Sequence, residues 1–167
     1  SITKKLLEIV SLSNGFKLIF DEQLIGGSAI DKTGNPLPPE TLEACKKSDA
    51  ILLAAIGSPK FDNLPREKRP ETGLLCLREG LGLFANIRPV KIIPSLIEAS
   101  TLKEEVISGV DMIVVRELTG GIYFGKPKGR VKSKSEERAF NTMTYSNKEI
   151  NDIARVAFDL TTNRKKK

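Results

Sequence analysis

Residues 112–125 read MIVVRELTGGIYFG and combine an apolar run, a charged pair and a glycine-rich turn. Met112 to Val115 is uniformly apolar, which is typical of a strand buried on both faces of a largely parallel sheet. Arg116 follows directly, and the C-terminal ends of such strands are where α/β sheets bind ligands. The glycines after it predict sharp turns around Tyr123. This stretch therefore predicts a sheet strand with a ligand-binding arginine at its end.

Strands and helices alternate on both sides of this stretch. The other expected strands are a buried apolar run at 50–56 and a half-buried segment in which Phe16, Leu18 and Phe20 alternate with polar residues. Helical spacing and start signals predict helices at about 2–10, 40–45, 71–80, 101–107 (capped by Ser100 or Thr101) and 146–160, where Ser146 and Glu149 form a capping box. This alternation predicts an α/β architecture with a mostly parallel core.

The amino-acid composition excludes some kinds of active site. The chain of 167 residues contains no histidine, which excludes His-based metal sites and every triad with an imidazole base. Cys45 and Cys76 lack CxxC spacing, so we expect two reduced, buried thiols. The apolar runs are too short for a bilayer and no signal segment opens the chain, so we expect neither membrane insertion nor export.

The net charge of +6 is concentrated in two basic clusters, at 126–134 and 164–167. Neither cluster has interleaved aromatic residues, so base stacking is poorly supported. We expect solvated surfaces and no nucleic-acid partner. The alternative, a basic nucleic-acid-binding protein, predicts salt-sensitive retention on DNA that disappears when residues 164–167 are removed.

One face of the predicted helix at 71–80 has a mixed character. It carries the four residues Glu71, Leu74, Leu75 and Arg78 at i, i+3, i+4 and i+7. A site for a ligand with both an alkyl group and a carboxylate would need this mixture. The alternative is a purely structural helix whose arginine extends its charged end to solvent.

Two further arginines and a tyrosine are candidates for a site. Arg88 follows a predicted extended segment and Arg116 follows a predicted strand, and arginine offers bidentate geometry for carboxylates. Arg116 has the alternative of pairing with Glu117 or another local acid. Tyr123 is either a proton donor or a packing residue. The spacing alone leaves these alternatives open.

Three motifs occur in order along the chain: RPETGLLCLRE at 69–79, LFANIRP at 83–89 and VVRELTGGIYFGKPKGR at 114–130. Together they resemble the β-decarboxylating dehydrogenases, the isocitrate/isopropylmalate dehydrogenase family. The likeness extends over the whole chain. It implies an α/β fold of parallel or mixed sheets flanked by helices, with two domains and an NAD site that is not of the Rossmann type.

The resemblance also implies roles for the candidate residues. It makes Arg78, Arg88 and Arg116 ligands of the substrate carboxylates, and Leu74 and Leu75 the wall that receives an isopropyl group. Tyr123 would assist decarboxylation and protonation as a catalytic residue. The cofactor would be bordered by a loop and an acidic helix start, with the residues Ser58, Pro59, Lys60, Glu71 and Thr72.

The activity that the resemblance implies is oxidation of 3-isopropylmalate with NAD, followed by loss of CO2, in leucine biosynthesis. It implies Mg²⁺ or Mn²⁺ with ligands outside this chain, and a homodimer formed through an arm at about 120–141. We expect residues 1–83 to belong to the NAD-side domain and 84–167 to the dimerisation domain, in the cytoplasm or a plastid stroma.

The family's first strand, its general-base lysine and its metal-binding aspartates are expected outside residues 1–167. We therefore expect this chain to be inactive by itself. The alternative is a non-catalytic remnant or a dimerising interaction module of the same fold.

Overall fold

The structure of the chain is a computed structural model that describes residues 2–164. The basic residues 165–167, part of the second predicted cluster, lie outside this range. The chain divides into two compact units, residues 1–77 and 78–167, and each is considered by itself. The division falls inside a helix, whereas the resemblance places a domain boundary between residues 83 and 84.

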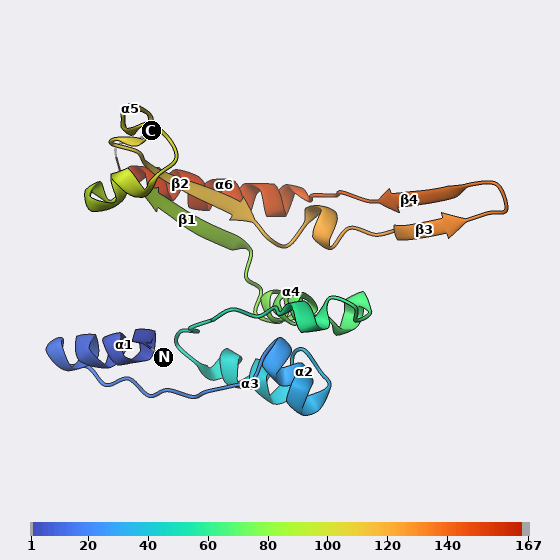
Figure 1. Ribbon diagram of the computed structural model, residues 1–167, viewed down its shortest axis with the longest axis horizontal. Coiled ribbons are helices and arrows are strands. Elements are labelled where there is room, and N and C mark those ends of the chain that lie inside the picture. The colour runs from blue at the N-terminus through green and yellow to red at the C-terminus, as the bar shows by residue number, and fades with distance from the viewer. Residues whose placement is uncertain (1, 165–167) are drawn as a thin grey trace. The chain divides into compact units, whose positions relative to one another are not determined.

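The first unit is helical (Figure 1). Its elements are α1 (Ile2–Ser13), α2 (Gly27–Thr33), α3 (Pro39–Lys47), the short 3-10 helices η1 (Pro59–Phe61) and η2 (Arg66–Lys68), and α4 (Pro70–Gly80), which crosses the division. Proline at the first position of α3 suits a site where no backbone N–H bond is lost. The expected helices at 2–10, 40–45 and 71–80 are confirmed.

The core of the first unit is small. Its buried side chains include Ala29, Thr41, Phe61, Pro70 and Leu77. The Thr41 hydroxyl donates to the carbonyl oxygen of Leu24 at 2.8 Å, which ties α3 to the segment before α2. A Cβ at Gly27 would lie only 2.6 Å from the Phe61 ring, so α2 approaches that ring closely because residue 27 has no side chain.

The two strands predicted for the first unit are absent from the part of the chain that the structure describes. Residues 16–20 and 50–56 are extended but unpaired, and Ile51, Leu52 and Leu53 are 41%, 59% and 41% exposed. The prediction of a buried strand at 50–56 is therefore wrong for this structure. A strand forms through hydrogen bonds to a neighbouring strand, and no described segment pairs with either stretch.

The second unit contains two ribbons and a long helix (Figure 1). Its elements are β1 (Ala85–Lys91), η3 (Pro94–Ala99), α5 (Glu104–Ile107), β2 (Asp111–Glu117), η4 (Gly121–Tyr123), β3 (Lys128–Lys132), β4 (Glu137–Asn141) and α6 (Asn147–Thr162). β1 pairs with β2 and β3 with β4, both antiparallel. The mixture of helices and strands confirms the α/β class.

The strand predicted at 112–115 exists, but its expected parallel pairing and full burial are wrong among the described residues. Met112 and Val114 are 50% and 48% exposed, while Ile113 and Val115 are half-buried. This alternation shows that β2 is covered on one face only. Helix α6 packs against β2, and Arg164 near its end forms an ion pair with Asp111, on the Ile113 face, at 2.6 Å.

Two predicted helix starts have different outcomes. The capping box of α6 is confirmed, because the Ser146 hydroxyl accepts from the Glu149 N–H and the Glu149 carboxylate accepts from the Ser146 N–H. The predicted cap at Ser100 or Thr101 is wrong, because Lys103 occupies the N-cap position of α5 and the Ser100 hydroxyl accepts from the Leu102 N–H in a local turn. Helix α5 consequently starts later and is a single turn, Glu104–Ile107.

Candidate active site

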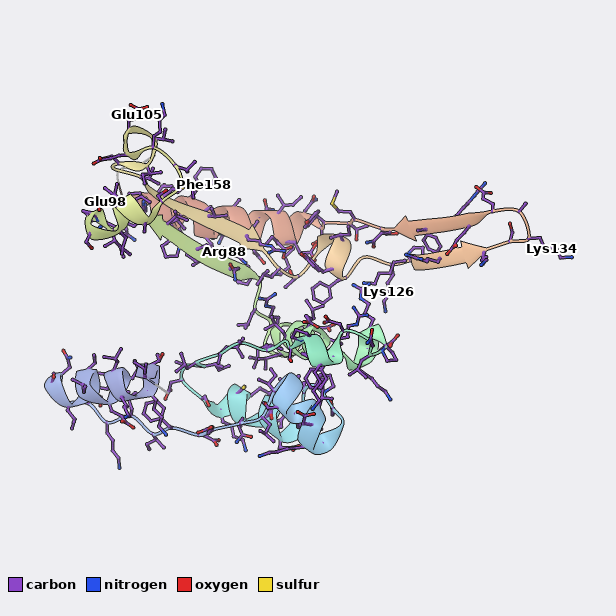
Figure 2. The ribbon with its side chains drawn as sticks, viewed as in Figure 1. Arg88, Glu98, Glu105, Lys126, Lys134 and Phe158 are labelled. Atoms are coloured by element: carbon purple, nitrogen blue, oxygen red, sulfur yellow. The ribbon has the colours of Figure 1, made fainter. Side chains whose placement is uncertain are left out.

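The ribbon of β1 and β2 brings two of the predicted arginines to one face. Asn86 is the cross-strand partner of Arg116. Arg88 lies two residues beyond Asn86 and therefore on the same face. The Arg88 guanidinium donates from Nε to the Asn86 Oδ1 at 2.7 Å, and the side chain of Arg88 is exposed (Figure 2). This face lies opposite to Ile113 and Val115.

Tyr123 joins this pair of arginines. The Arg116 Nη2 donates to the Tyr123 hydroxyl oxygen at 2.7 Å, and the guanidinium carbon lies 5.3 Å from the centre of the Tyr123 ring. The tyrosine is 44% exposed, so part of this side chain is open to solvent. Arg116 contacts Tyr123 and forms no ion pair with Glu117, its alternative partner, whose carboxylate binds Thr119 and Gly120 instead.

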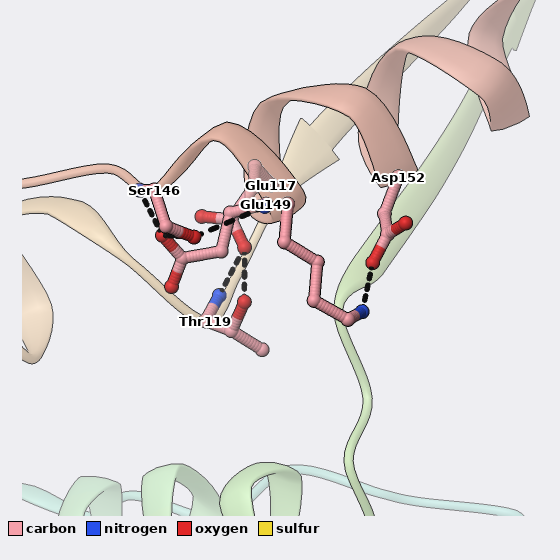
Figure 3. A network of polar contacts seen from close by, with 6 residues as sticks. Glu117, Thr119, Ser146, Glu149 and Asp152 are labelled. Atoms are coloured by element: carbon pink, nitrogen blue, oxygen red, sulfur yellow. Dashed lines mark hydrogen bonds and ion pairs between the residues drawn. The ribbon is translucent and has the colours of Figure 1, made fainter.

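Glu117 folds the turn that carries Tyr123. Its Oε1 accepts from the Thr119 N–H and hydroxyl, both at 2.5 Å (Figure 3). Its Oε2 accepts from the Gly120 N–H at 2.9 Å. Burial raises the pKa of Glu117, but these hydrogen bonds lower it by more, so the pKa lies below its ordinary value of 4.5. The carboxylate is therefore ionised at neutral pH and acts only as an acceptor.

The glycines of this turn allow close approach to the segment before α6. The Gly121 N–H donates to the Thr144 carbonyl at 2.8 Å, and Gly121 has a φ of +69°. Any Cβ at Gly121 would overlap the Tyr145 hydroxyl, and one at Gly120 would lie 2.9 Å from the Tyr145 ring. The turn is therefore held between β2 and the start of α6.

Helix α4 carries the other predicted substrate residues. Its buried stripe is Pro70, Gly73 and Leu77, at i, i+3 and i+7. The predicted face is a different one: Leu74, Leu75 and Arg78 are half-buried and Glu71 is exposed. The alkyl and charged groups of this face are therefore not fully buried in the core.

The residues expected to border the cofactor make contacts with neighbouring residues. A Cβ at Gly57 would lie 2.8 Å from the Glu71 Oε1, so this carboxylate adjoins the start of the loop. The Lys60 ammonium pairs with Asp31 at 2.5 Å, and the Thr72 hydroxyl donates to the Arg66 carbonyl at 2.5 Å. Ser58 and Pro59 are exposed beside Lys60.

A resident divalent cation is not supported by the described side chains. Such a cation takes several oxygen ligands. Within residues 2–164, no three Asp, Glu, His or Cys side chains gather as a metal-binding group. We therefore assign no step to a metal held by this chain. Cys76 is exposed, which corrects the expectation of a buried thiol, and Cys45 is half-buried.

Three contributors to this site were not found in the sequence. Asn86 binds Arg88, the Glu117 carboxylate binds the following turn, and Tyr145 packs on Gly120 and Gly121. The sequence signal for Glu117 was its position three residues before Gly120, within reach of the N–H groups of a tight turn. For Tyr145 there is no local signal, because its contact is made across the fold.

Two solved structures of dehydrogenases have a similar fold. The chain superimposes on an isocitrate dehydrogenase from Methylococcus capsulatus with a TM-score of 0.64 and 26% identity, covering 92% of this chain and 42% of that one. The fold of a β-decarboxylating dehydrogenase from Thermococcus kodakarensis matches with a TM-score of 0.56 over 89% and 38% of the two chains. The chain thus shares the fold of these dehydrogenases.

All of residues 1–167 match the family model of isocitrate/isopropylmalate dehydrogenases, so the chain belongs to this family. Among its relatives are proteins named 3-isopropylmalate dehydrogenase. One from Parasynechococcus marenigrum is 68% identical over 99% of this chain and 46% of the relative. One from a strain of Prochlorococcus marinus is 62% identical over 100% of this chain and 46% of the relative. The chain spans about half the length of these relatives.

Proposed function

We propose that this chain provides the substrate-binding part of an NAD-dependent 3-isopropylmalate dehydrogenase of leucine biosynthesis, which oxidises its substrate and releases CO2. The names of relatives at 62–68% identity support this substrate. The structural observation that carries the proposal is the 2.7 Å bond between Arg116 and the Tyr123 hydroxyl, on the ribbon face that also carries Arg88.

The arginines bind the two carboxylates of the substrate. A guanidinium presents a planar fork of donors that matches the two oxygens of a carboxylate, and it stays charged at every physiological pH. Arg88 and Arg116 offer such forks from adjacent strands, and we assign Arg78 of α4 to the same task. Binding both carboxylates fixes the orientation of the carbon that carries the hydroxyl group.

Leu74 and Leu75 select the alkyl substituent. Both are half-buried on α4, so each has apolar surface left to cover an isopropyl group. Removing that group from water contributes about 2 kcal/mol, or roughly a 30-fold preference over an unsubstituted malate. Two leucines offer no hydrogen bond to a further carboxylate, which disfavours isocitrate at this position.

Tyr123 acts in the second half of the reaction. After CO2 leaves, the substrate is an enol that must gain a proton on carbon. The Tyr123 hydroxyl accepts from Arg116, so its own proton points away from the guanidinium and is available for donation. NAD, when bound, accepts the hydride of the first half, and we assign Ser58, Pro59, Lys60, Glu71 and Thr72 to its border.

We also propose that a second copy of the chain pairs through the arm, residues 120–141. The face of the β3–β4 hairpin that carries Val131 and Phe140 is exposed, at 58% and 43%. Figure 2 labels Lys126 before the hairpin and Lys134 at its tip. A projecting ribbon with an open apolar face is suited to pair with an identical ribbon related by a two-fold axis.

The enzymatic proposal is testable in a chimera in which residues 1–167 replace the matching segment of the Parasynechococcus marenigrum relative. With 3-isopropylmalate, NAD and Mg²⁺, we expect NADH to form. Arg116→Ala should lower kcat/KM about 10- to 100-fold, because a charge-assisted bond to the substrate is lost. Arg116→Lys should be intermediate, since lysine lacks the fork.

Arg155→Ala is the matched control, because Arg155 is an exposed arginine of α6 outside the proposed site. Its kcat/KM should equal that of the unmutated chimera. A chimera that forms no NADH, or one that keeps its turnover after Arg116→Ala, would contradict the proposal.

A further inference from the structure

We propose that Glu117 is a positioning residue, which holds the turn at 118–121 so that the Tyr123 hydroxyl stays on the Arg116 guanidinium. This inference rests on the proposed function and extends it to a residue that touches no substrate. Arg116 precedes Glu117 directly, and Tyr123 lies at the other end of the turn that Glu117 binds.

The Glu117 carboxylate is fully engaged by one short turn. Three donors reach it: the Thr119 N–H, the Thr119 hydroxyl and the Gly120 N–H, at 2.5, 2.5 and 2.9 Å. All three donors need an acceptor, and each of the two oxygens of a carboxylate can accept more than one hydrogen bond. Figure 3 shows the carboxylate beside Thr119, below the start of α6.

These bonds fix the direction in which the chain leaves β2. The Leu118 N–H donates to the Phe84 carbonyl at 2.9 Å, so the ladder continues to that residue. Glu117 then binds the next two backbone groups, and Gly121 begins η4, which carries Tyr123. The geometry of the Arg116–Tyr123 contact therefore depends on a turn closed by the residue next to the arginine.

A second set of contacts holds the opposite side of the turn. The Thr144 carbonyl accepts from Gly121, and a Cβ at Gly120 would lie 3.2 Å from a Glu149 carboxylate oxygen. These contacts keep the turn near α6 without Glu117. Losing the Glu117 carboxylate should therefore disturb the direction of Tyr123 more than it disturbs the fold.

Two substitutions separate these effects. Glu117→Gln removes half of the acceptor capacity and places an amide NH2 against a backbone N–H, either that of Gly120 or that of Thr119. Thr119→Val removes only the hydroxyl donor and is the milder change. Thr119→Ser restores the hydroxyl and should behave like the unmutated protein.

The kinetic test uses the chimera. Glu117→Gln should lower kcat about 10-fold or more while the KM for 3-isopropylmalate changes less than about 3-fold, because misorientation of a reacting group affects the chemical step. In the Tyr123→Phe background the same substitution should change kcat less than about 2-fold, since residues that act as one unit are not additive. Thr119→Val should give a smaller loss, and Thr119→Ser none.

Glu43→Gln is the matched control. Glu43 lies on α3, where Lys46 binds it at 2.8 Å and lowers its pKa, and it is exposed. It should leave kcat and KM unchanged. Equal losses of kcat from Glu117→Gln in the Tyr123 and Tyr123→Phe backgrounds would show a general structural effect and overturn the inference, as would an unchanged kcat.

A measurement independent of activity keeps the two proposals distinguishable. In the chimera labelled with ¹³Cζ-tyrosine, Tyr123→Phe identifies the Tyr123 resonance. Glu117→Gln should shift this resonance and Glu43→Gln should not. A chimera that forms no NADH contradicts the proposed function alone, whereas an unmoved Tyr123 resonance overturns the positioning role alone.

Discussion

At the scale of single residues, the candidate site depends on glycines as much as on residues that have side chains. The segment between β2 and β3 contains Gly120, Gly121 and Gly125, and each lies against another segment. The Gly125 N–H donates to the Gly121 carbonyl at 2.8 Å. Any Cβ at Gly125 would overlap the carbonyl oxygen of Thr142, which is backbone and cannot rotate away.

We therefore expect Gly125→Ala to lower the free energy of unfolding of the chimera by about 2 kcal/mol, the usual effect of overpacking a close contact. Urea unfolding followed by circular dichroism measures it. Gly129→Ala is the control, because a Cβ there would lie 3.6 Å from the Phe140 ring, an ordinary contact. Equal stabilities of the two variants would show that the Gly125 contact is not required.

At the scale of elements, the arm is an amphipathic ribbon. Gly129 is paired with Phe140 and Val131 with Arg138, so the two apolar side chains share one face, which also carries Arg138. The opposite face carries charges, with Arg130 3.6 Å from Glu137. The backbone turn at the tip is closed by Ser133, whose N–H donates to the Glu136 carbonyl at 2.8 Å. Because the turn at the tip closes the hairpin, the register of β3 and β4 does not depend on a second copy of the chain.

If the Val131 and Phe140 face pairs two copies, Phe140→Lys should weaken the dimer of the chimera about 10-fold or more, because it buries a charge in place of an apolar ring. Sedimentation velocity over a dilution series measures this change. Ala139→Lys, on the opposite face, should leave the dimer constant unchanged. A chimera that is monomeric throughout, or equally weakened by both substitutions, would contradict pairing through this face.

At the scale of the whole molecule, many apolar side chains of the chain are exposed to solvent. Ile51, Leu52 and Leu53 are exposed in the first unit, and Phe158 of α6 is 72% exposed in the second (Figure 2). Among residues 2–164, no helix is long and apolar enough to cross a bilayer. Further exposed apolar side chains lie on α1, on β1 and β2, and on the β3–β4 hairpin.

Hydrogen exchange should distinguish the unpaired segment 50–56 from the paired strands β1 and β2. In the chain of residues 1–167, the amides of 50–56 should exchange within seconds, because unpaired backbone is open to water, while those of β1 and β2 should be slower. In the chimera, the amides of 50–56 should become protected if the added segment supplies a neighbouring strand. Mass spectrometry of peptic peptides measures both, and strong protection of 50–56 in the shorter chain would contradict the structure.

The sequence by itself determined the local features of this protein. Helices α1, α3, α4 and α6 follow from apolar spacing, proline and the Ser146–Glu149 box, which act within a few residues of each other. The family follows from three collinear motifs, and the candidate residues Arg88, Arg116 and Tyr123 follow from their positions in these motifs.

Only the tertiary structure decided which strands exist and which residues meet. An apolar extended segment becomes a strand when another segment offers its backbone groups, so 50–56 and 112–115 look alike in sequence and differ in structure. The register of β1 and β2 sets Asn86 opposite Arg116, and the turn bound by Glu117 brings Tyr123 to the guanidinium. These contacts depend on hydrogen bonds between distant residues, which local sequence patterns do not specify.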